Sequence, residues 1–196
     1  ARPDLYVVMA LNFFASTMGL NFQIFNALMA TKEFGKGPAS YGLLGTYVAI
    51  GSLAGALISA RLERFRDSML VVRLGVVFSL VVIATAFMPT YWTYSLWLPI
   101  GGVSALAMLI SANSYVQVNS DPAVRGRVMG IYLLIFLGGT PLGSLFIGYM
   151  TEAVGVRETI FICGVIPLVA ATLLWVFFKD KLQKPDDLRV STILKR

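Results

Sequence analysis

Long apolar segments, separated by short polar gaps, constrain this chain more than any other feature of its sequence. A helix rises about 1.5 Å per residue, so roughly 20 residues cross the hydrocarbon layer of a membrane. Each segment is long enough for one such helix. The pattern predicts an all-α, polytopic membrane protein built as a six-transmembrane-helix bundle. The segments lie at about 5–30, 40–60, 69–88, 93–118, 128–150 and 159–178, and a polar tail follows at 179–196.

The composition agrees with a chain surrounded by lipid. Hydrophobic residues make up 57% of the sequence and charged residues only 13%, whereas soluble domains carry roughly 25% charged residues. A net charge of +6 is compatible with nucleic-acid binding, but the charges lie in the gaps between the apolar segments and form no basic domain. We therefore expect the lipid bilayer, and no nucleic acid, as a partner.

The residue types that enzymatic or metal chemistry needs are scarce. The sequence has no histidine, and its single cysteine, Cys163, lies inside the last apolar segment. This excludes a disulfide within one chain and a cysteine-based metal site. No Asp, Glu, Lys or Arg lies deep in any apolar segment, so neither a nucleophile–base pair nor a proton-coupling carboxylate is visible. The sequence predicts a protein without enzymatic activity, cofactor or metal.

The distribution of lysine and arginine predicts the orientation. With a cytoplasmic N-terminus, thirteen of the 16 lysines and arginines fall on the cytoplasmic side, and Lys32, Lys36 and Arg157 fall on the other. Cytoplasmic loops are enriched in these residues, so we expect a multi-pass protein of the plasma (inner) membrane with both termini in the cytoplasm. The basic residues of its cytoplasmic loops would include Arg61, Arg64, Arg66, Arg125 and Arg127.

Neutral polar residues recur along the first apolar segment. Asn12, Ser16, Gly19, Gln23 and Asn26 follow one another at spacings of 4, 3, 4 and 3, which places them on one face of an α-helix. An unsatisfied amide is costly in hydrocarbon, so this face must meet protein or water. Two interpretations stay open. The face lines a central cavity, or it forms hydrogen bonds between helices, each worth about 0.6 kcal/mol.

A second polar group ends the fourth segment, where Asn113 and Gln117 lie beside Ser111 and Ser114. Lining of a path and packing between helices are equally compatible with this pattern. The candidate residues of a substrate path are accordingly Asn12, Ser16, Gln23, Asn26, Asn113 and Gln117.

Glycines recur at intervals of four residues in two segments, as Gly51 and Gly55 in the second and as Gly139 and Gly143 in the fifth. Rows of small residues let two helix backbones approach closely. Pro141, within the second row, frees a backbone carbonyl and is expected to kink its helix. Static packing and bending during a functional cycle are both compatible with these residues.

Three stretches carry a resemblance to a known family. They are GPASYGLLG at 37–45, GALISAR at 55–61, and RGRVMG at 125–130 followed by GTPLGS at 139–144. These stretches resemble the major facilitator superfamily, in particular the C-terminal six-helix half of exporters in its enterobactin-exporter and macrolide-efflux branch. The resemblance covers nearly the whole chain up to residue 178. It implies a fold of two six-helix bundles around a central cavity.

The resemblance also implies a function and two partners. The function is that of a secondary transporter, which exports an amphipathic small molecule such as a drug or a siderophore by alternating access. The partners are this substrate and an N-terminal six-helix half; Ala1 is not an initiator methionine, which suggests a fragment. Two alternatives stay open, a non-transporting membrane subunit or receptor and a half-transporter that works as a homodimer.

Overall fold

The computed structural model describes residues 3–62 and 67–182, and every regular element within these ranges is a helix. Arg64, Arg66 and residues 183–196 of the predicted tail lie outside the described residues. The predicted six-helix membrane bundle is confirmed. Its six long apolar helical segments are Asp4–Glu33, Pro38–Arg61, Ser68–Ala86, Tyr91–Asn119, Arg125–Val154 and Val156–Phe178.

Five of the segments are single α-helices, whereas the first is divided. The single helices are α3 (Pro38–Leu62), α4 (Ser68–Ala86), α5 (Tyr91–Asn119), α6 (Arg125–Val154) and α7 (Val156–Leu182). The first segment consists of α1 (Pro3–Phe14), the π-helix η1 (Ala15–Gly19), α2 (Phe22–Leu28) and the π-helix η2 (Met29–Glu33). Helix α6 continues through Pro141, where a kink was expected. The interruption lies instead in the first segment, which was predicted as one regular helix.

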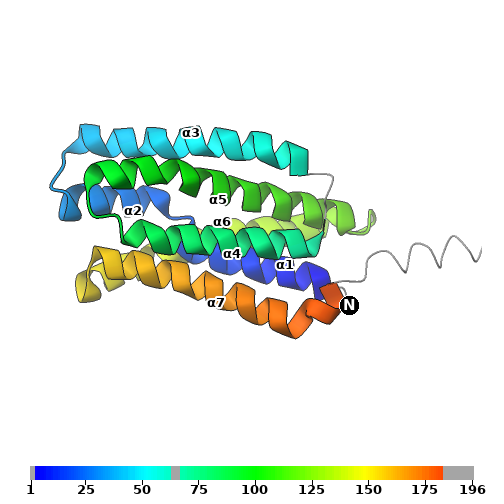
Figure 1. The fold of residues 1–196 in the computed structure, drawn as a ribbon. Coiled ribbons are helices and arrows are strands. Elements are labelled where there is room, and N and C mark those ends of the chain that lie inside the picture. The colour runs from blue at the N-terminus through cyan, green and yellow to red at the C-terminus, as the bar shows by residue number, and fades with distance from the viewer. Residues whose placement is uncertain (1–2, 63–66, 183–196) are drawn as a thin grey trace, which may run out of the picture.

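Local signals end the helices and keep their connections short. Thr90 and Thr93 form a reciprocal capping box at the start of α5. Asp67 caps α4, because its side chain accepts a hydrogen bond from the Met69 N–H at 3.2 Å. Gly155 has a φ of 104°, which glycine adopts at little cost, and it joins α6 directly to α7. Successive long segments therefore run antiparallel (Figure 1), although α5, and not α4, packs beside α3.

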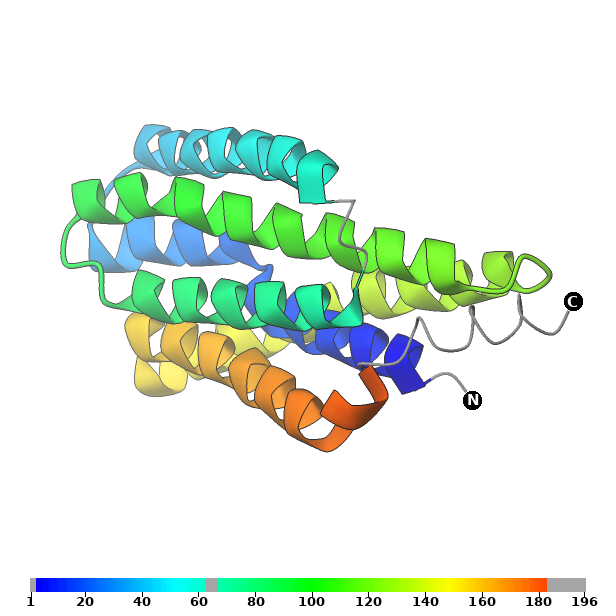
Figure 2. The ribbon, with the colours of Figure 1, turned by 45° about the vertical axis from the view of Figure 1, so that its right-hand side comes forward.

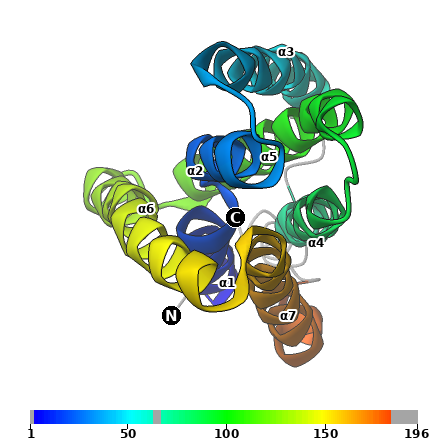
Figure 3. The same ribbon diagram turned by 90° about the vertical axis from the view of Figure 1, so that its left-hand side faces the viewer.

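Seen end on, the bundle has one side that is less covered than the other (Figure 3). On the covered side α4 and α7 lie together, whereas on the other side α3 and α6 lie apart, with the first segment and α5 between them. In their most apolar stretches, 22% of α3 and of α6 is buried, against 50–56% of the first segment, α4 and α5. The two helices that flank the open side are thus the least enclosed ones.

The two ends of the bundle are named here by what they contain (Figure 2). The Arg157 end holds η2, the turn between α4 and α5 and the start of α7, and the N-terminal end holds the start of α1 and the loop between α5 and α6. Two separate clusters of buried apolar side chains fill the interior. The cluster toward the Arg157 end includes Phe25, Phe78 and Leu98, and the cluster toward the N-terminal end includes Leu11, Val72 and Val116.

Candidate substrate path

The first segment leaves the α-helical path near its middle, where η1 meets α2. Leu20 and Asn21 have ψ angles of 12° and 39°, far from the α-helical value of about −42°. The Leu20 N–H reaches back five residues to the Ala15 carbonyl at 3.0 Å. The Asn21 side chain donates to the Thr17 carbonyl at 2.9 Å, and thus replaces one backbone hydrogen bond that the break removes.

Glycines of α6 make room for this irregular stretch. A Cβ atom at Gly143 would overlap the Thr17 carbonyl oxygen. A Cβ atom at Gly139 would lie 2.5 Å from Thr17 Oγ1 and 3.0 Å from Ser16 Oγ. The glycine row of the fifth segment is therefore the surface on which η1 rests.

The other predicted glycine row lies against a different helix. A Cβ atom at Gly51 would overlap the Pro99 carbonyl oxygen, and one at Gly55 would lie 2.7 Å from the Val103 carbonyl oxygen. Backbone meets backbone at both positions, so that α3 and α5 pack with no side chain between them at these points.

The predicted polar residues of the first segment differ in burial. Asn12, Ser16 and Asn26 are buried, whereas Gln23 is exposed. The reason is the irregular backbone, because the wide turn of η1 and the break after it change the angle between residues on either side. The spacing of 4, 3, 4 and 3 therefore aligns side chains only as far as the α-helix continues.

Asn12 is a buried amide without a partner. It is 1% exposed, and neither its Oδ1 nor its Nδ2 has a hydrogen-bond partner within the described part of the chain. The Thr17 hydroxyl is also buried and lacks a partner there, whereas Ser16 Oγ donates to the Phe13 carbonyl at 3.1 Å. A buried polar group left unpaired costs about 1–3 kcal/mol, so the Asn12 carboxamide lowers the stability of the bundle in this conformation.

Asn26 is buried in a different setting. Its Oδ1 accepts a hydrogen bond from the Tyr94 hydroxyl at 2.9 Å, across 68 residues of sequence. Both side chains are buried. In this conformation Asn26 therefore joins α2 to α5.

A pocket of about 250 Å³ lies between α5 and α6. Asn113 belongs to its wall, whereas Gln117 is exposed and is not among the lining residues. The first segment and α6 run in the same direction, and Ser16 lies beside Gly139. Asn12 precedes Ser16 by one helical turn, so it lies at about the level of residues 132–136 of α6. The lining residues are Leu109, Ile110, Asn113, Ser114, Tyr132, Leu133 and Phe136.

The sequence matches the model of a family described as transmembrane secretion effector over residues 4–194. This chain belongs to the major facilitator superfamily. It is similar to an uncharacterised MFS-type transporter of Enterobacter sp. (strain 638), with 24% identity over 107 residues, which are 54% of this chain and 28% of the relative. It is also similar to the uncharacterised MFS-type transporter YcaD of Escherichia fergusonii, with 23% identity over 138 residues, which are 68% of this chain and 36% of the relative.

Membership of the major facilitator superfamily, together with six apolar helices, makes the protein a multi-pass integral membrane protein of a transporter family. The matched segments span only 28% and 36% of the two relatives. No group of three histidine, cysteine, aspartate or glutamate side chains comes together among residues 3–62 and 67–182. The polar residues that line the pocket, Asn113, Ser114 and Tyr132, are neutral.

The predicted loop arginines that are described lie at the N-terminal end of this major facilitator bundle. Arg61 and Arg127 are exposed. Arg125 donates from Nη2 to the Ser120 carbonyl at 3.5 Å. These residues lie at the opposite end of the helices from Arg157.

Two residues of the site were missed in the sequence analysis. Asn21 lies off the predicted polar face, yet its side chain stabilises the break. A signal was present, because Gly19 and Asn21 are close together in an apolar segment and both residue types favour irregular backbone. Tyr132 lines the pocket, but a lone tyrosine among apolar residues has no spacing pattern that would have identified it.

Proposed function

We propose that this chain is the C-terminal half of a secondary transporter that exports an amphipathic small molecule by alternating access. In this proposal Asn12 and the pocket between α5 and α6 belong to the substrate path. The observation that carries it is the unpaired, buried Asn12 carboxamide at the level of a pocket that contains Asn113 and Tyr132. Export is favoured by the description of the matching family as a secretion effector.

The chemistry of the pocket supports an amphipathic substrate. Asn113, Ser114 and Tyr132 supply neutral hydrogen-bonding groups, while Ile110 and Phe136 supply apolar surface. Ligand sites commonly combine a mostly apolar wall with a few polar groups that fix orientation. No lining residue is charged, so this wall suits a substrate with an apolar body and neutral polar groups facing it.

A second six-helix half would cover the side between α3 and α6. Both helices are poorly enclosed, and both carry glycines with open space above them, such as Gly45 on α3 and Gly138 on α6. Small residues on an open face allow another helix to approach closely. The short coverage of the relatives, 28% and 36%, supports a longer transporter of which this chain is part.

We propose that the protein lies in the plasma (inner) membrane, with the N-terminal end of the bundle on the cytoplasmic side. Lys36 then faces outward and Arg127 inward, in line with the excess of basic residues in cytoplasmic loops. An impermeant maleimide added to intact cells should label Lys36→Cys and leave Arg127→Cys unlabelled. The reverse pattern would contradict the orientation.

The substrate path is tested by the water accessibility of its residues in the full-length transporter. N-ethylmaleimide reacts with hydrated thiolates, so Asn113→Cys should react. Thr172→Cys is the matched control, because Thr172 is exposed on α7, a helix on the side of the bundle away from the open face (Figure 3), and lipid should protect it. Equal protection of both cysteines would contradict a hydrated path and favour a non-transporting bundle.

The activity itself is tested by comparing the full-length transporter with this chain alone in liposomes loaded with ethidium, an amphipathic probe. Efflux by the full-length protein, lowered by Asn113→Leu and unchanged by Thr172→Val, supports the proposal. Efflux by this chain alone would contradict the need for a second half and favour a homodimer of two copies.

A further inference from the structure

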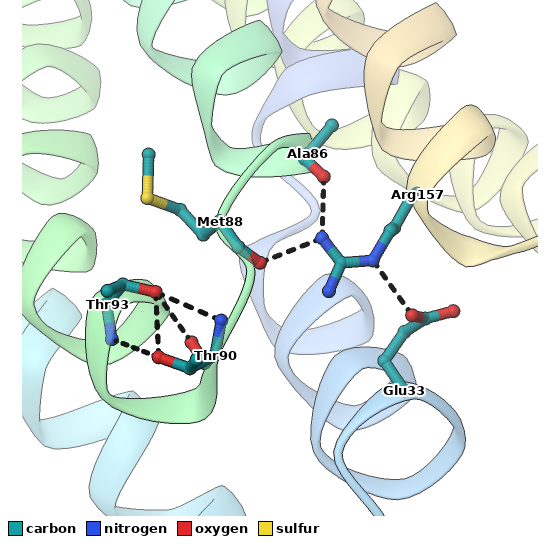
Figure 4. Close-up of polar contacts among 6 residues, drawn as sticks. All are labelled: Glu33, Ala86, Met88, Thr90, Thr93 and Arg157. Atoms are coloured by element: carbon teal, nitrogen blue, oxygen red, sulfur yellow. Dashed lines mark hydrogen bonds and ion pairs between the residues drawn. The ribbon is translucent and has the colours of Figure 1, made fainter.

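At the Arg157 end, one side chain joins three parts of the bundle (Figure 4). Arg157, at the start of α7, places Nε 2.9 Å from Glu33 Oε2 at the end of η2. Its Nη1 donates to the Ala86 carbonyl at 3.0 Å and to the Met88 carbonyl at 2.8 Å. One guanidinium thus bonds the end of the first segment and the end of α4 at the same time.

The chemistry of this contact needs arginine. The last carbonyls of a helix have no partner within the helix and carry partial negative charge. The Ala86 carbonyl, at the end of α4, is such a group, and it accepts a hydrogen bond from Arg157. A guanidinium has five N–H donors in a fixed plane, so different edges can serve a carboxylate and carbonyls together. A lysine ammonium has no such fixed fork.

Aromatic rings extend the contact to the neighbouring helices. The Arg157 guanidinium lies 5.8 Å from the ring centre of Phe34. This ring meets Tyr91 edge-on at 6.0 Å and Tyr94 at 5.7 Å. The Tyr91 hydroxyl donates to the Ser40 carbonyl at 2.8 Å at the start of α3. We call Glu33, Phe34, Tyr91, Tyr94 and Arg157 the Arg157 cluster.

The first segment passes from one buried apolar cluster to the other. Leu11 of α1 belongs to the cluster toward the N-terminal end, whereas Phe25 and Met29 belong to the cluster toward the Arg157 end. The irregular stretch between Ala15 and Asn21 lies between these anchoring residues. The arm formed by α2 and η2 and the arm formed by α1 are therefore packed into different parts of the interior.

We propose that Arg157 is a conformational latch. While its bonds to Glu33, Ala86 and Met88 are in place, the arm from Phe22 to Glu33 is fixed to α4 and α7. Release of Glu33 lets that arm move independently of α1, with the irregular stretch as the joint. The latch goes beyond the proposed transport function and depends only on the helical bundle, so it is testable without a substrate.

Hydrogen exchange, measured by mass spectrometry on the full chain in lipid nanodiscs, tests the latch. In Arg157→Gln, the backbone amides of residues 22–34 should exchange about tenfold faster or more, because local opening loses three bonds. Amides of residues 3–14 should change by less than about twofold. Glu33→Gln keeps the two carbonyl bonds, so it should give a smaller acceleration confined to the same residues.

Two variants control for the loss of charge. Glu152→Gln alters an exposed carboxylate on α6, and Arg73→Gln alters an exposed arginine on α4; neither should accelerate exchange in residues 22–34. Acceleration of both arms to the same extent in Glu33→Gln would overturn the latch, since the cluster would then support the fold as a whole. Unchanged exchange in both Glu33→Gln and Arg157→Gln would overturn it as well.

Discussion

At the Arg157 end, a guanidinium and three aromatic rings connect the first segment with α3, α4, α5 and α7, whereas the polar side-chain contacts seen among the described residues of the N-terminal end each join two elements. There the Tyr115 hydroxyl donates to Asp4 Oδ2 at 2.8 Å, and Arg125 donates to the Ser120 carbonyl at 3.5 Å. Apolar side chains fill both ends. Among residues 3–62 and 67–182, the two ends therefore differ in how many elements one polar group joins.

This difference shows how a membrane bundle can hold one end more firmly than the other. Between helices in lipid the hydrophobic driving force is weak, and close packing and hydrogen bonds decide which contacts persist. The Arg157 cluster concentrates such bonds at one end, while η1 and the break after it lie between the two apolar clusters. In the proposed transport cycle, we expect the described contacts of the N-terminal end to rearrange more readily than the Arg157 cluster.

The largest effect is expected between the two ends, at Gly143, where α6 meets the irregular stretch of the first segment. In Gly143→Ala, the new Cβ would overlap the Thr17 carbonyl oxygen, a backbone atom that cannot rotate away. The first segment must then move off α6, and we expect the free energy of unfolding to fall by about 3 kcal/mol. Unfolding in mixed micelles, followed by circular dichroism, measures it.

Gly148→Ala is the matched control, with the same substitution on the same helix. Nothing lies within 4 Å of a Cβ atom at Gly148, so the better helix propensity of alanine should leave stability unchanged or raise it by up to about 1 kcal/mol. Equal losses in both variants would show that the contact between η1 and α6 is not what Gly143 provides.

The second effect compares one arginine from each end. Arg157→Gln removes an ion pair and two carbonyl bonds, and we expect a loss of about 2 kcal/mol in the free energy of unfolding. Arg125→Gln removes one bond of 3.5 Å, and a loss below about 0.5 kcal/mol is expected. Similar losses in the same micelle assay would remove the contrast between the ends.

The third effect, in Tyr94→Phe, tests how much the hydrogen bond between Tyr94 and Asn26 stabilises the Arg157 end. The substitution keeps the ring contact with Phe34 but leaves Asn26 Oδ1 buried without its donor, so a loss of about 1–2 kcal/mol in the free energy of unfolding is expected. In the double variant with Asn26→Leu the unpaired oxygen is gone, and the combined loss should be smaller than the sum of the single losses. Additive losses would show that the two side chains do not act as a pair.

The helical bundle was predictable from the sequence because each span depends on local composition. Segments such as 69–88 are apolar throughout, and a helix there satisfies its own backbone without help from other elements. The capping of α5 is local in the same sense, because Thr90 and Thr93 are only three residues apart. The major facilitator membership was also visible in short sequence stretches.

The candidate site was less predictable, because it depends on contacts between distant residues. The polar spacing from Asn12 to Asn26 assumed a regular helix, but the π-helical turn of η1 lies between them, and Gln23 is exposed whereas Asn12 and Asn26 are buried. That turn is stabilised by Gly139 and Gly143, more than a hundred residues away. The hydrogen bond between Glu33 and Arg157 spans 124 residues, and no local sequence pattern predicts it.

The smallest expected effect, with the opposite sign, is at Asn12. Asn12→Leu replaces a carboxamide by an apolar group with the same number and branching of heavy atoms, at a site where both polar atoms are buried without a partner in the described chain. Removing an unpaired buried amide should raise the free energy of unfolding by up to about 1 kcal/mol. Asn26→Leu is the matched control, because the same substitution there removes a bonded amide and should lower stability. If Asn12→Leu destabilises the chain as much as Asn26→Leu does, Asn12 has a partner in the folded bundle, and its amide is not free to bind a substrate. If it stabilises the chain and also lowers export by the full-length transporter, the unpaired amide is retained for the substrate at a cost to the fold.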